Sequence, residues 1–360
     1  MLGCIDASFR TARMMAPLPD RGWHGFWSQS GLVPALAPFG ALFAAVARCR
    51  QRRHRAGVDG AWRASVPVIV VGNLSVGGAG KTPMVIWLLT YLQRRGWRPG
   101  VVSRGYGGRH RVEPLLVTAA SDPRHSGDEP LLIARRSDVP VVVARNRVAA
   151  VRRLLAEGVN IVVSDDGLQH YRLARDVEIV MIDGRRGLGN GLCLPAGPLR
   201  EPPDRLASVD LTVATGDGEV AFGHLADYRM QLQARAILEA GARIAVGLER
   251  LPTGPVHGVA GIGDPEQFFT TLTKLGCEVV RHPYPDHHVF RWQDLDFDEP
   301  WPILMTEKDM MRCQPDFADW PAALRRRCLA VVVNAVLGPA WELALDEVMT
   351  AKGCVPEQRA

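Results

Sequence analysis

A glycine-rich segment that ends in a lysine and a threonine is the part of this sequence best suited to chemistry. It reads, in order, Ser75, Val76, Gly77, Gly78, Ala79, Gly80, Lys81 and Thr82. Glycines let backbone N–H groups turn inward around phosphates, and the start of a following helix adds partial positive charge. Lys81 can reach the β- and γ-phosphates, and the Thr82 hydroxyl can bind Mg²⁺. The segment predicts a P-loop, although Ser75 stands where a glycine is usual.

Two adjacent carboxylates, Asp165 and Asp166, follow the apolar run Asn160–Ser164. Sites in α/β proteins lie at the carboxyl ends of parallel strands, where this pair is expected. Two neighbouring carboxylates repel each other unless a cation neutralises them. We therefore expect Asp165 or Asp166 to bind Mg²⁺ together with Thr82. Neither carboxylate has a glycine at the spacing that a GTPase needs. The lysine of Thr306-Glu307-Lys308-Asp309 is one position too late for guanine recognition.

The elements that must position these residues alternate between strands and helices. Val66–Gly72 is a continuous apolar run, typical of a strand buried on both faces, and Lys81–Arg95 has helical periodicity. Alternation of this kind predicts a parallel α/β sheet. Near Tyr228–Glu249 the pattern changes to polar/apolar alternation, and a second α/β unit follows. We expect a P-loop-containing parallel sheet domain, a second, smaller α/β domain and an N-terminal membrane-associated helix. The predicted ranges are 1–55 for an N-terminal extension and apolar stem, 56–225 for the P-loop domain, 226–255 for a β linker and 256–360 for the smaller domain.

The N-terminal stem combines an uncharged segment with a basic end. Gly31–Ala47 is uncharged over 17 residues, and five arginines follow it by Arg55. Trp23, Phe26 and Trp27 precede it, and such aromatics settle at membrane interfaces. A span needs about 20 apolar residues, so the stem either crosses the bilayer once or lies in its interface; a buried core helix is a further alternative. The arginines place the bulk of the chain on the cytoplasmic side.

Composition narrows the classes of protein further. The chain has 360 residues, of which 47% are apolar and 22% charged, so it is neither disordered nor a polytopic membrane protein. The net charge of +5 comes entirely from residues 1–60, so a nucleic-acid partner is not expected. The seven cysteines form no CxxC pair, which argues against a zinc knuckle or a disulfide framework and fits a reducing compartment.

A series of short motifs, in the order in which they occur along nearly the whole chain, resembles one family, the tetraacyldisaccharide 4'-kinases of lipid A biosynthesis. The resemblance rests on Val70–Pro83, Ser103–Gly108, Gly127–Pro130, Asp165–His170, Leu194–Glu201, Gly261–Gly263, Asp286-His287 and Thr306–Asp309. Residues up to about 16 have no counterpart in it.

The resemblance implies two α/β domains with the active site between them, and ATP and Mg²⁺ as cofactors. It implies that Asp128 and His287 work as a pair in proton abstraction. Taken alone, Asp128 could be a carboxylate that only stabilises a helix N-terminus, and His287, next to His288, could be a surface histidine. The resemblance also makes Glu201 a candidate for metal or acceptor binding. Tyr106 and Arg147 would line the phosphate region, and Arg104 would either contact an anionic headgroup or be solvated.

The predicted function is transfer of the γ-phosphate of ATP to the 4'-hydroxyl of a tetraacyldisaccharide 1-phosphate. The catalytic residues would be Lys81, Asp128 and His287, at the cytoplasmic face of a bacterial inner membrane and without an obligate protein partner. Two alternatives remain open at this point: a membrane-tethered nucleotide switch or partition-type ATPase, and a soluble small-molecule kinase.

Overall fold

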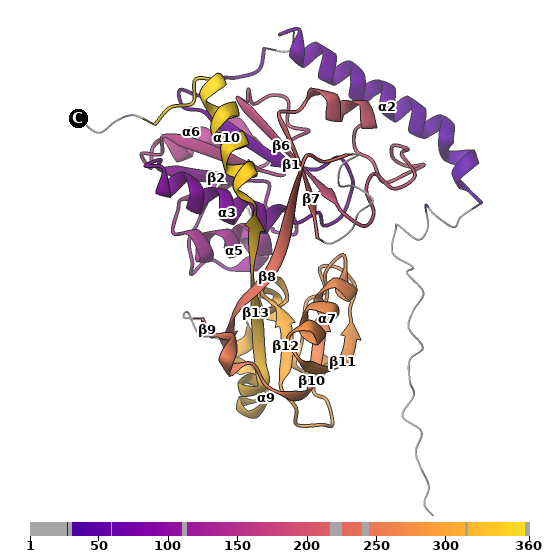
Figure 1. The fold of residues 1–360 in the computed structure, drawn as a ribbon, viewed down its shortest axis with the longest axis vertical. Coiled ribbons are helices and arrows are strands. Elements are labelled where there is room, and N and C mark those ends of the chain that lie inside the picture. The colour runs from indigo at the N-terminus through magenta and orange to yellow at the C-terminus, as the bar shows by residue number, and fades with distance from the viewer. Residues whose placement is uncertain are drawn as a thin grey trace, which may run out of the picture.

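The structure is a computed structural model that describes residues 27, 31–58, 60–109, 114–216, 225–239, 245–313 and 316–356. The predicted N-terminal extension, with Trp23 and Phe26, lies outside these residues. The described chain forms two lobes joined by two long strands, and a long helix lies across the outside of the first lobe (Figure 1).

One sheet runs through both lobes. Its strands lie side by side in the order β11-β10-β12-β13-β8-β7-β6-β1-β5-β2-β4-β3, and β9 pairs with β8. The first lobe contains β1 (Val68–Gly72), β2 (Pro99–Ser103), β3 (Leu115–Val117), β4 (Val141–Val143), β5 (Ile161–Asp165), β6 (Val177–Asp183) and β7 (Leu211–Thr215). The connecting strands are β8 (Tyr228–Glu239) and β13 (Cys328–Leu337). The second lobe adds β9 (Val246–Gly247), β10 (Gly254–Ala260), β11 (Cys277–Pro283) and β12 (Ile303–Thr306).

Strand β1 explains how the first lobe is layered. Successive side chains of a strand point to opposite faces, so Ile69 and Val71 enter one apolar core while Val68 and Val70 enter another. The first core is closed by helices α3 (Lys81–Arg94), α5 (Asp128–Ser137) and α10 (Pro339–Ala351), and the second by α6 (Arg147–Leu155). A short helix, α4 (Pro123–Ser126), precedes α5. The predicted P-loop strand and helix are confirmed to within two residues at each end.

The second lobe is a smaller α/β unit, as predicted. Helix α7 (Pro265–Lys274) packs on β10 and β11, while α8 (Glu307–Cys313) and α9 (Ala322–Arg327) lie near β12 and β13. Strands β11, β10, β12 and β13 run parallel to one another, whereas β8 pairs antiparallel with β9 and with β13. The β8–β13 pairing covers nine positions, from Leu329↔Glu239 to Leu337↔Met230. This pairing joins both lobes into one sheet, whereas the sequence predicted only a linker at 226–255.

Helix α10 falls within the range 256–360 that the sequence predicted for the second domain, but it packs on the first lobe. Trp341, Leu345 and Met349 are buried in the first lobe's apolar core. The Trp341 ring lies edge-on to Trp87 of α3, and the Tyr91 hydroxyl donates to Asp346. The chain therefore returns to the first lobe after β13, which Figure 1 shows as the yellow helix beside α3.

The apolar stem forms helix α2 (Val33–Arg55), which is not a core helix. By length and composition it could cross a membrane. Its Gly40 lies so close to the loop at 193–196 that a Cβ would approach Ala196 Cβ to 2.9 Å. Farther along, Arg48 pairs with Asp204 and Gln51 donates to Ser208. The opposite face leaves large apolar side chains exposed, namely Leu32, Phe39, Leu42, Phe43 and Val46. The helix is therefore docked along one narrow face and apolar on the other.

Candidate active site

The P-loop lies between β1 and α3, as the sequence predicted. Gly77 and Gly80 have φ values of 101° and 74°, a backbone region that favours glycine. Gly80 caps α3, so Lys81 and Thr82 begin the helix. Lys81 is buried, and its Nζ donates to Asn73 Oδ1 at 3.1 Å, while Asn73 Nδ2 donates to the carbonyl of Gly77 at 3.2 Å. Asn73 thus joins the start of the loop to its lysine.

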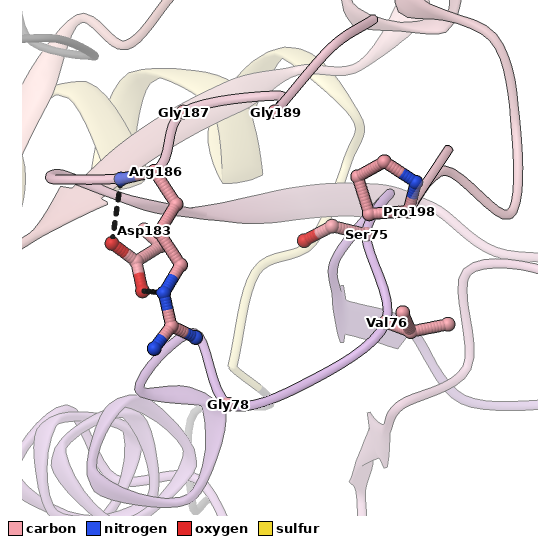
Figure 2. A pocket seen from close by; sticks show the side chains of 8 residues that line it. All are labelled: Ser75, Val76, Gly78, Asp183, Arg186, Gly187, Gly189 and Pro198. Carbon is pink, nitrogen blue, oxygen red and sulfur yellow. Dashed lines mark hydrogen bonds and ion pairs between the residues drawn. The ribbon is translucent and has the colours of Figure 1, made fainter. Parts of the chain in front are cut away.

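The loop is held at both ends by its own lobe and is approached by the other lobe. Val76 N donates to the Pro198 carbonyl at 2.8 Å, and Thr215 Oγ1 donates to the Ala79 carbonyl at 2.8 Å. Figure 2 shows a hollow beside Ser75 and Gly78, opposite Arg186. From the second lobe, a Cβ on Gly263 would lie 3.5 Å from Gly78 N, so the loop at 261–263 passes directly over the P-loop.

The two adjacent carboxylates have different surroundings. Asp166 lies in a left-handed turn at φ 47°, 3.0 Å from Arg200 Nη1 and 3.6 Å from Lys81 Nζ. Although burial opposes ionisation, Lys81 and Arg200 hold the pKa of Asp166 below its usual value. Asp165 ends β5 and accepts from Ser103 Oγ at 3.0 Å. Burial, with repulsion from Glu129 and Asp166, raises the pKa of Asp165 to about 7.

Three buried side-chain oxygens at the start of α3 and the end of β5 lack hydrogen-bond partners: Thr82 Oγ1, Ser164 Oγ and Asp165 Oδ1. Thr82 Oγ1 and Asp165 Oδ1 are the two that the sequence predicted as metal ligands. An orphaned hydroxyl and an orphaned carboxylate oxygen are the donors that a P-loop uses for Mg²⁺, so this pair fits the expected ion. Within the described part of the chain, no three His, Cys, Asp or Glu side chains gather as a self-sufficient metal site. A Mg²⁺ ion at Thr82 and Asp165 would therefore need phosphate oxygens of the nucleotide as further ligands.

Asp128 and His287 approach each other from opposite lobes. Asp128 is the first residue of α5 and is buried, and His287 lies in the loop after β11. His287 Nδ1 is 3.7 Å from Asp128 Oδ2. His287 has a φ of 62°, which is uncommon for a residue other than glycine, and its N–H donates to the Gly261 carbonyl at 3.2 Å. The neighbouring His288 instead contacts Asp294 Oδ2 at 3.1 Å.

Three further residues that the sequence analysis named, Tyr106, Arg147 and Arg104, differ in how far they are buried. Tyr106 is 70% exposed, and its ring centroid lies 5.4 Å from that of His287, at the mouth of the site. Arg147 is buried, with Nη1 donating to the Ala144 carbonyl at 2.8 Å and Nη2 to the Asp165 carbonyl at 3.3 Å. Burial lowers the pKa of Arg147 to about 10. Arg104 is exposed. Arg147 therefore supports the end of β5.

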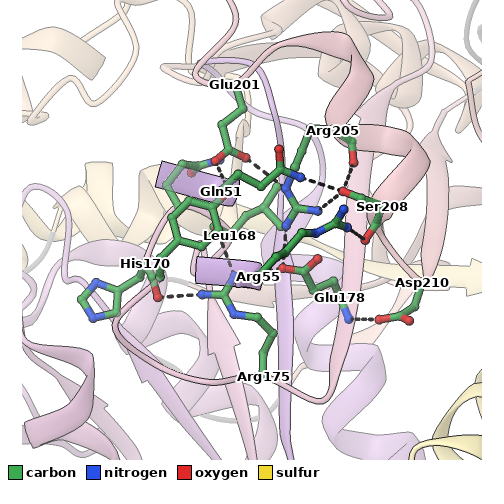
Figure 3. Close-up of polar contacts among 12 residues, drawn as sticks. Gln51, Arg55, Leu168, His170, Arg175, Glu178, Glu201, Arg205, Ser208 and Asp210 are labelled. Carbon is green, nitrogen blue, oxygen red and sulfur yellow. Dashed lines mark hydrogen bonds and ion pairs between the residues drawn. The ribbon is translucent and has the colours of Figure 1, made fainter. Parts of the chain in front are cut away.

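Glu201, predicted as a metal ligand, belongs to a different cluster. Its carboxylate accepts from the Tyr171 hydroxyl and lies 3.5 Å from Arg205 Nε. Arg205 also donates to Glu178 and to Ser208, which contacts α2 through Gln51 (Figure 3). Burial raises the pKa of Glu201. These contacts connect Glu201 to Arg205 and, through Arg205, to Ser208, which contacts α2. Its role in metal or acceptor binding stays a prediction.

The sequence reasoning missed the charged pairs that cross between the lobes. Lys308 of α8 forms an ion pair with Glu129 of α5, and this pairing with Lys308 lowers the pKa of Glu129. Arg312, also on α8, donates to Asp128 through Nε at 2.9 Å and Nη2 at 2.6 Å. Arg312 stands in the sequence among Met310, Met311 and Cys313. A charge inside an apolar run signals a buried ion pair, and this signal could have found it.

Fold and site together place the protein among the P-loop enzymes that transfer phosphoryl groups, with two lobes meeting over the phosphate loop. Residues 32–350 match the family model described as LpxK, tetraacyldisaccharide-1-P 4'-kinase. The chain belongs to this family, which confirms the resemblance noted in the sequence. Membership argues against both alternatives, the nucleotide switch and the soluble small-molecule kinase.

Curated relatives and a solved structure agree with this assignment. The chain is 51% identical over 279 residues to the tetraacyldisaccharide 4'-kinase of Alkalilimnicola ehrlichii, covering 78% of this chain and 83% of that protein. It is 49% identical over 319 residues to that of Pseudomonas aeruginosa PAO1, covering 87% and 93%. A crystal structure described as the "apo" form of LpxK from Aquifex aeolicus in complex with ATP superposes with a TM-score of 0.72 at 27% identity, covering 89% of this chain and 99% of that one.

Proposed function

We propose that this chain transfers the γ-phosphate of ATP to the 4'-hydroxyl of a tetraacyldisaccharide 1-phosphate. One observation supports this most directly. The first lobe carries a P-loop, and Asp128 of that lobe lies next to His287 of the second lobe. In the reaction a bond forms between the 4'-oxygen and the γ-phosphorus, and the bond to the β–γ bridging oxygen breaks. ADP leaves, and the hydroxyl proton passes to the Asp128–His287 pair.

The P-loop half of the site binds and orients the triphosphate. Its glycines leave backbone N–H groups free to point at phosphate oxygens, and the start of α3 adds partial positive charge. Lys81 is held by Asn73 and lies 3.6 Å from Asp166, so its ammonium is positioned before nucleotide binds. A preorganised cation stabilises the charge that spreads over the transferred phosphoryl group without reorganising during the reaction.

Mg²⁺ would be held by Thr82 and Asp165. Both offer a buried oxygen without a partner, whereas Asp166 is engaged by Arg200 and Lys81. When bound, the ion would neutralise charge on the β- and γ-phosphates. Glu201 is left out of this proposal: its Oε2 also lacks a hydrogen-bond partner, but Tyr171 donates to Oε1 and Arg205 Nε lies 3.5 Å from Oε2.

The proton of the acceptor hydroxyl requires a base, because the attacking oxygen becomes positively charged and more acidic as its bond to phosphorus forms. A carboxylate beside an imidazole suits this task, since the carboxylate can accept the proton and its negative charge stabilises the charged form of the ring. Asp128 and His287 provide these two groups, and Tyr106 at the mouth of the site is available to pack against a sugar ring.

Helix α2 associates with the membrane in this proposal and lies in the interface of its cytoplasmic face. Contacts with the first lobe run from Gly40 to Arg55, so the docked helix cannot also cross the bilayer along that length. Its exposed apolar side chains and basic end suit a lipid surface with anionic headgroups. Such a surface would present the acylated acceptor to the site.

The function is tested with γ-labelled ATP and a tetraacyldisaccharide 1-phosphate in detergent micelles. The expected result is label in the lipid, dependent on Mg²⁺ and absent when the acceptor is omitted. If the label appeared only as inorganic phosphate, the chain would hydrolyse ATP without phosphorylating the lipid. That result would contradict the proposal and favour the nucleotide switch.

A further inference from the structure

Arg312 is a buried arginine of the second lobe whose side chain ends inside the active site. It lies on α8, and Nε and Nη2 both donate to Asp128 Oδ2 across the lobe boundary. Among the described residues, every hydrogen bond that Asp128 accepts at its carboxylate goes to this one oxygen. The second oxygen, Oδ1, is therefore left available to an acceptor hydroxyl.

The same guanidinium also holds the segment that carries His287. Arg312 Nη1 donates to the Gly261 carbonyl at 2.5 Å and to Asp309 Oδ1 at 3.0 Å. The Gly261 carbonyl is also the acceptor for the His287 N–H. Arg312 Nη2 lies 3.1 Å from His287 Nδ1, which is closer than the 3.7 Å between His287 Nδ1 and Asp128. Since a guanidinium only donates, this contact is a hydrogen bond when Nδ1 carries no proton.

We propose that Arg312 is a positioning residue that aligns Asp128 and His287 when the two lobes meet. The proposal rests on the proposed function, since it assumes that this pair accepts the hydroxyl proton. Asp128 belongs to the first lobe and His287 to the second, and their distance is too long for a direct hydrogen bond. The rigid, planar fork of Arg312 bridges that gap, because its donors have fixed relative directions. Alignment of the base thus depends on closure of the lobes.

A second arginine between the same two helices provides a matched control. Arg136 of α5 pairs with Glu307 of α8 and donates to Asn334 of β13, but none of these contacts reaches Asp128 or His287. Both arginines therefore join the lobes, and only Arg312 touches the pair. If the two arginines only hold the lobes together, substituting either one should lower activity to a similar extent. If Arg312 aligns the base, substitution of Arg312 should lower activity much more than substitution of Arg136.

The experiment compares Arg312→Ala and Arg136→Ala in the labelled-ATP assay. We expect Arg312→Ala to lower kcat about a hundredfold with KM for ATP unchanged, as a misaligned catalytic group does. Arg136→Ala should change kcat by less than about threefold while lowering the thermal unfolding temperature. Equal losses of kcat in both variants, or an undiminished kcat in Arg312→Ala, would overturn the proposal.

Chemical rescue separates positioning from misfolding. Added guanidinium, at concentrations that leave the wild type folded, should restore part of the kcat of Arg312→Ala and none of that of Asp128→Ala. Arg312→Lys keeps the charge but loses the fork, so it should recover no more than about a tenth of the wild-type kcat. If Arg312→Lys is fully active or guanidinium has no effect on folded Arg312→Ala, Arg312 is not a positioning residue. If Asp128→Ala itself stays active, the proposed function fails instead.

Discussion

The two halves of the site are built in different ways. The phosphate half comes from one continuous segment, in which a buried strand, a glycine turn and a helix follow each other, with Asn73 and Lys81 eight residues apart. The proton half is assembled from α5 of one lobe and from α8 and two loops of the other. In the proposed mechanism, phosphate binding is therefore preorganised within the first lobe, whereas proton transfer depends on contacts between the lobes. Substitutions in the two halves should affect different kinetic constants.

The largest effect is expected from Lys81→Ala in the phosphate half. It removes the cation next to the transferred group, and kcat/KM should fall by about a thousandfold or more. The check is steady-state kinetics with varied ATP. Arg94→Ala, an exposed arginine on the same helix, serves as the control and should behave as the wild type. A Lys81→Ala enzyme with normal kcat/KM would remove the P-loop from the mechanism.

Asp128→Asn should have the next largest effect and should leave the phosphate half intact. Loss of the base is expected to lower kcat by about 10²–10⁴-fold with little change in the KM for ATP. The exposed Asp138 at the other end of α5 provides the control, because Asn suits its left-handed backbone. If Asp128→Asn weakens ATP binding as strongly as Lys81→Ala does, the two halves are not independent.

A smaller, pH-dependent effect is expected at Asp165. With a pKa of about 7, this buried carboxyl holds its proton below neutrality and releases it above. Mg²⁺ requires the deprotonated carboxylate, so the affinity for Mg²⁺ in the presence of ATP should rise between about pH 6 and pH 8. Titrations of activity against Mg²⁺ at several pH values measure this rise. Protonation of ATP itself also changes the affinity for Mg²⁺ with pH, and it does so equally in Asp165→Asn. The affinity for Mg²⁺ should therefore rise less steeply with pH in that variant than in the wild type. Equal slopes would exclude Asp165 as the ligand.

The smallest catalytic effect is expected outside both halves, at the exposed face of α2. Leu42→Glu places a charge on that face and should reduce recovery with anionic lipid vesicles, while kcat in detergent micelles stays within about twofold of the wild type. Leu343→Glu on α10 is the matched control, since both leucines are 64% exposed. Equal recovery of the two variants with vesicles would argue against α2 as the membrane contact.

Much of the phosphate half could be predicted from the sequence because its determinants are local. The apolar run, the glycines and Lys81-Thr82 are consecutive, so the strand, turn and helix follow from short-range preferences. The family resemblance supplied Asp128 and His287, which periodicity and spacing alone would have left as a helix N-terminal acid and a surface histidine.

The features that the sequence did not predict depend on contacts between residues that are far apart in the chain. The β8–β13 pairing joins residues roughly a hundred positions apart, and no local pattern encodes which distant strand β8 will meet. Glu201 follows Arg200, which binds Asp166, but the two side chains diverge, and the contacts of Glu201 with Tyr171 and Arg205 appear only in three dimensions. Arg312 meets Asp128 across 184 positions.

The return of α10 to the first lobe has a consequence for how the protein is made. Trp341, Leu345 and Met349 fill the core on which α3 also packs, yet the ribosome adds them after the whole of the second lobe. The nucleotide-binding lobe therefore cannot finish folding during translation of its own strands, and it stays incomplete while the inserted second lobe is synthesised. A nascent chain stalled before Gly338 would expose the apolar surface that this helix covers, and exposed apolar surface of this kind promotes aggregation.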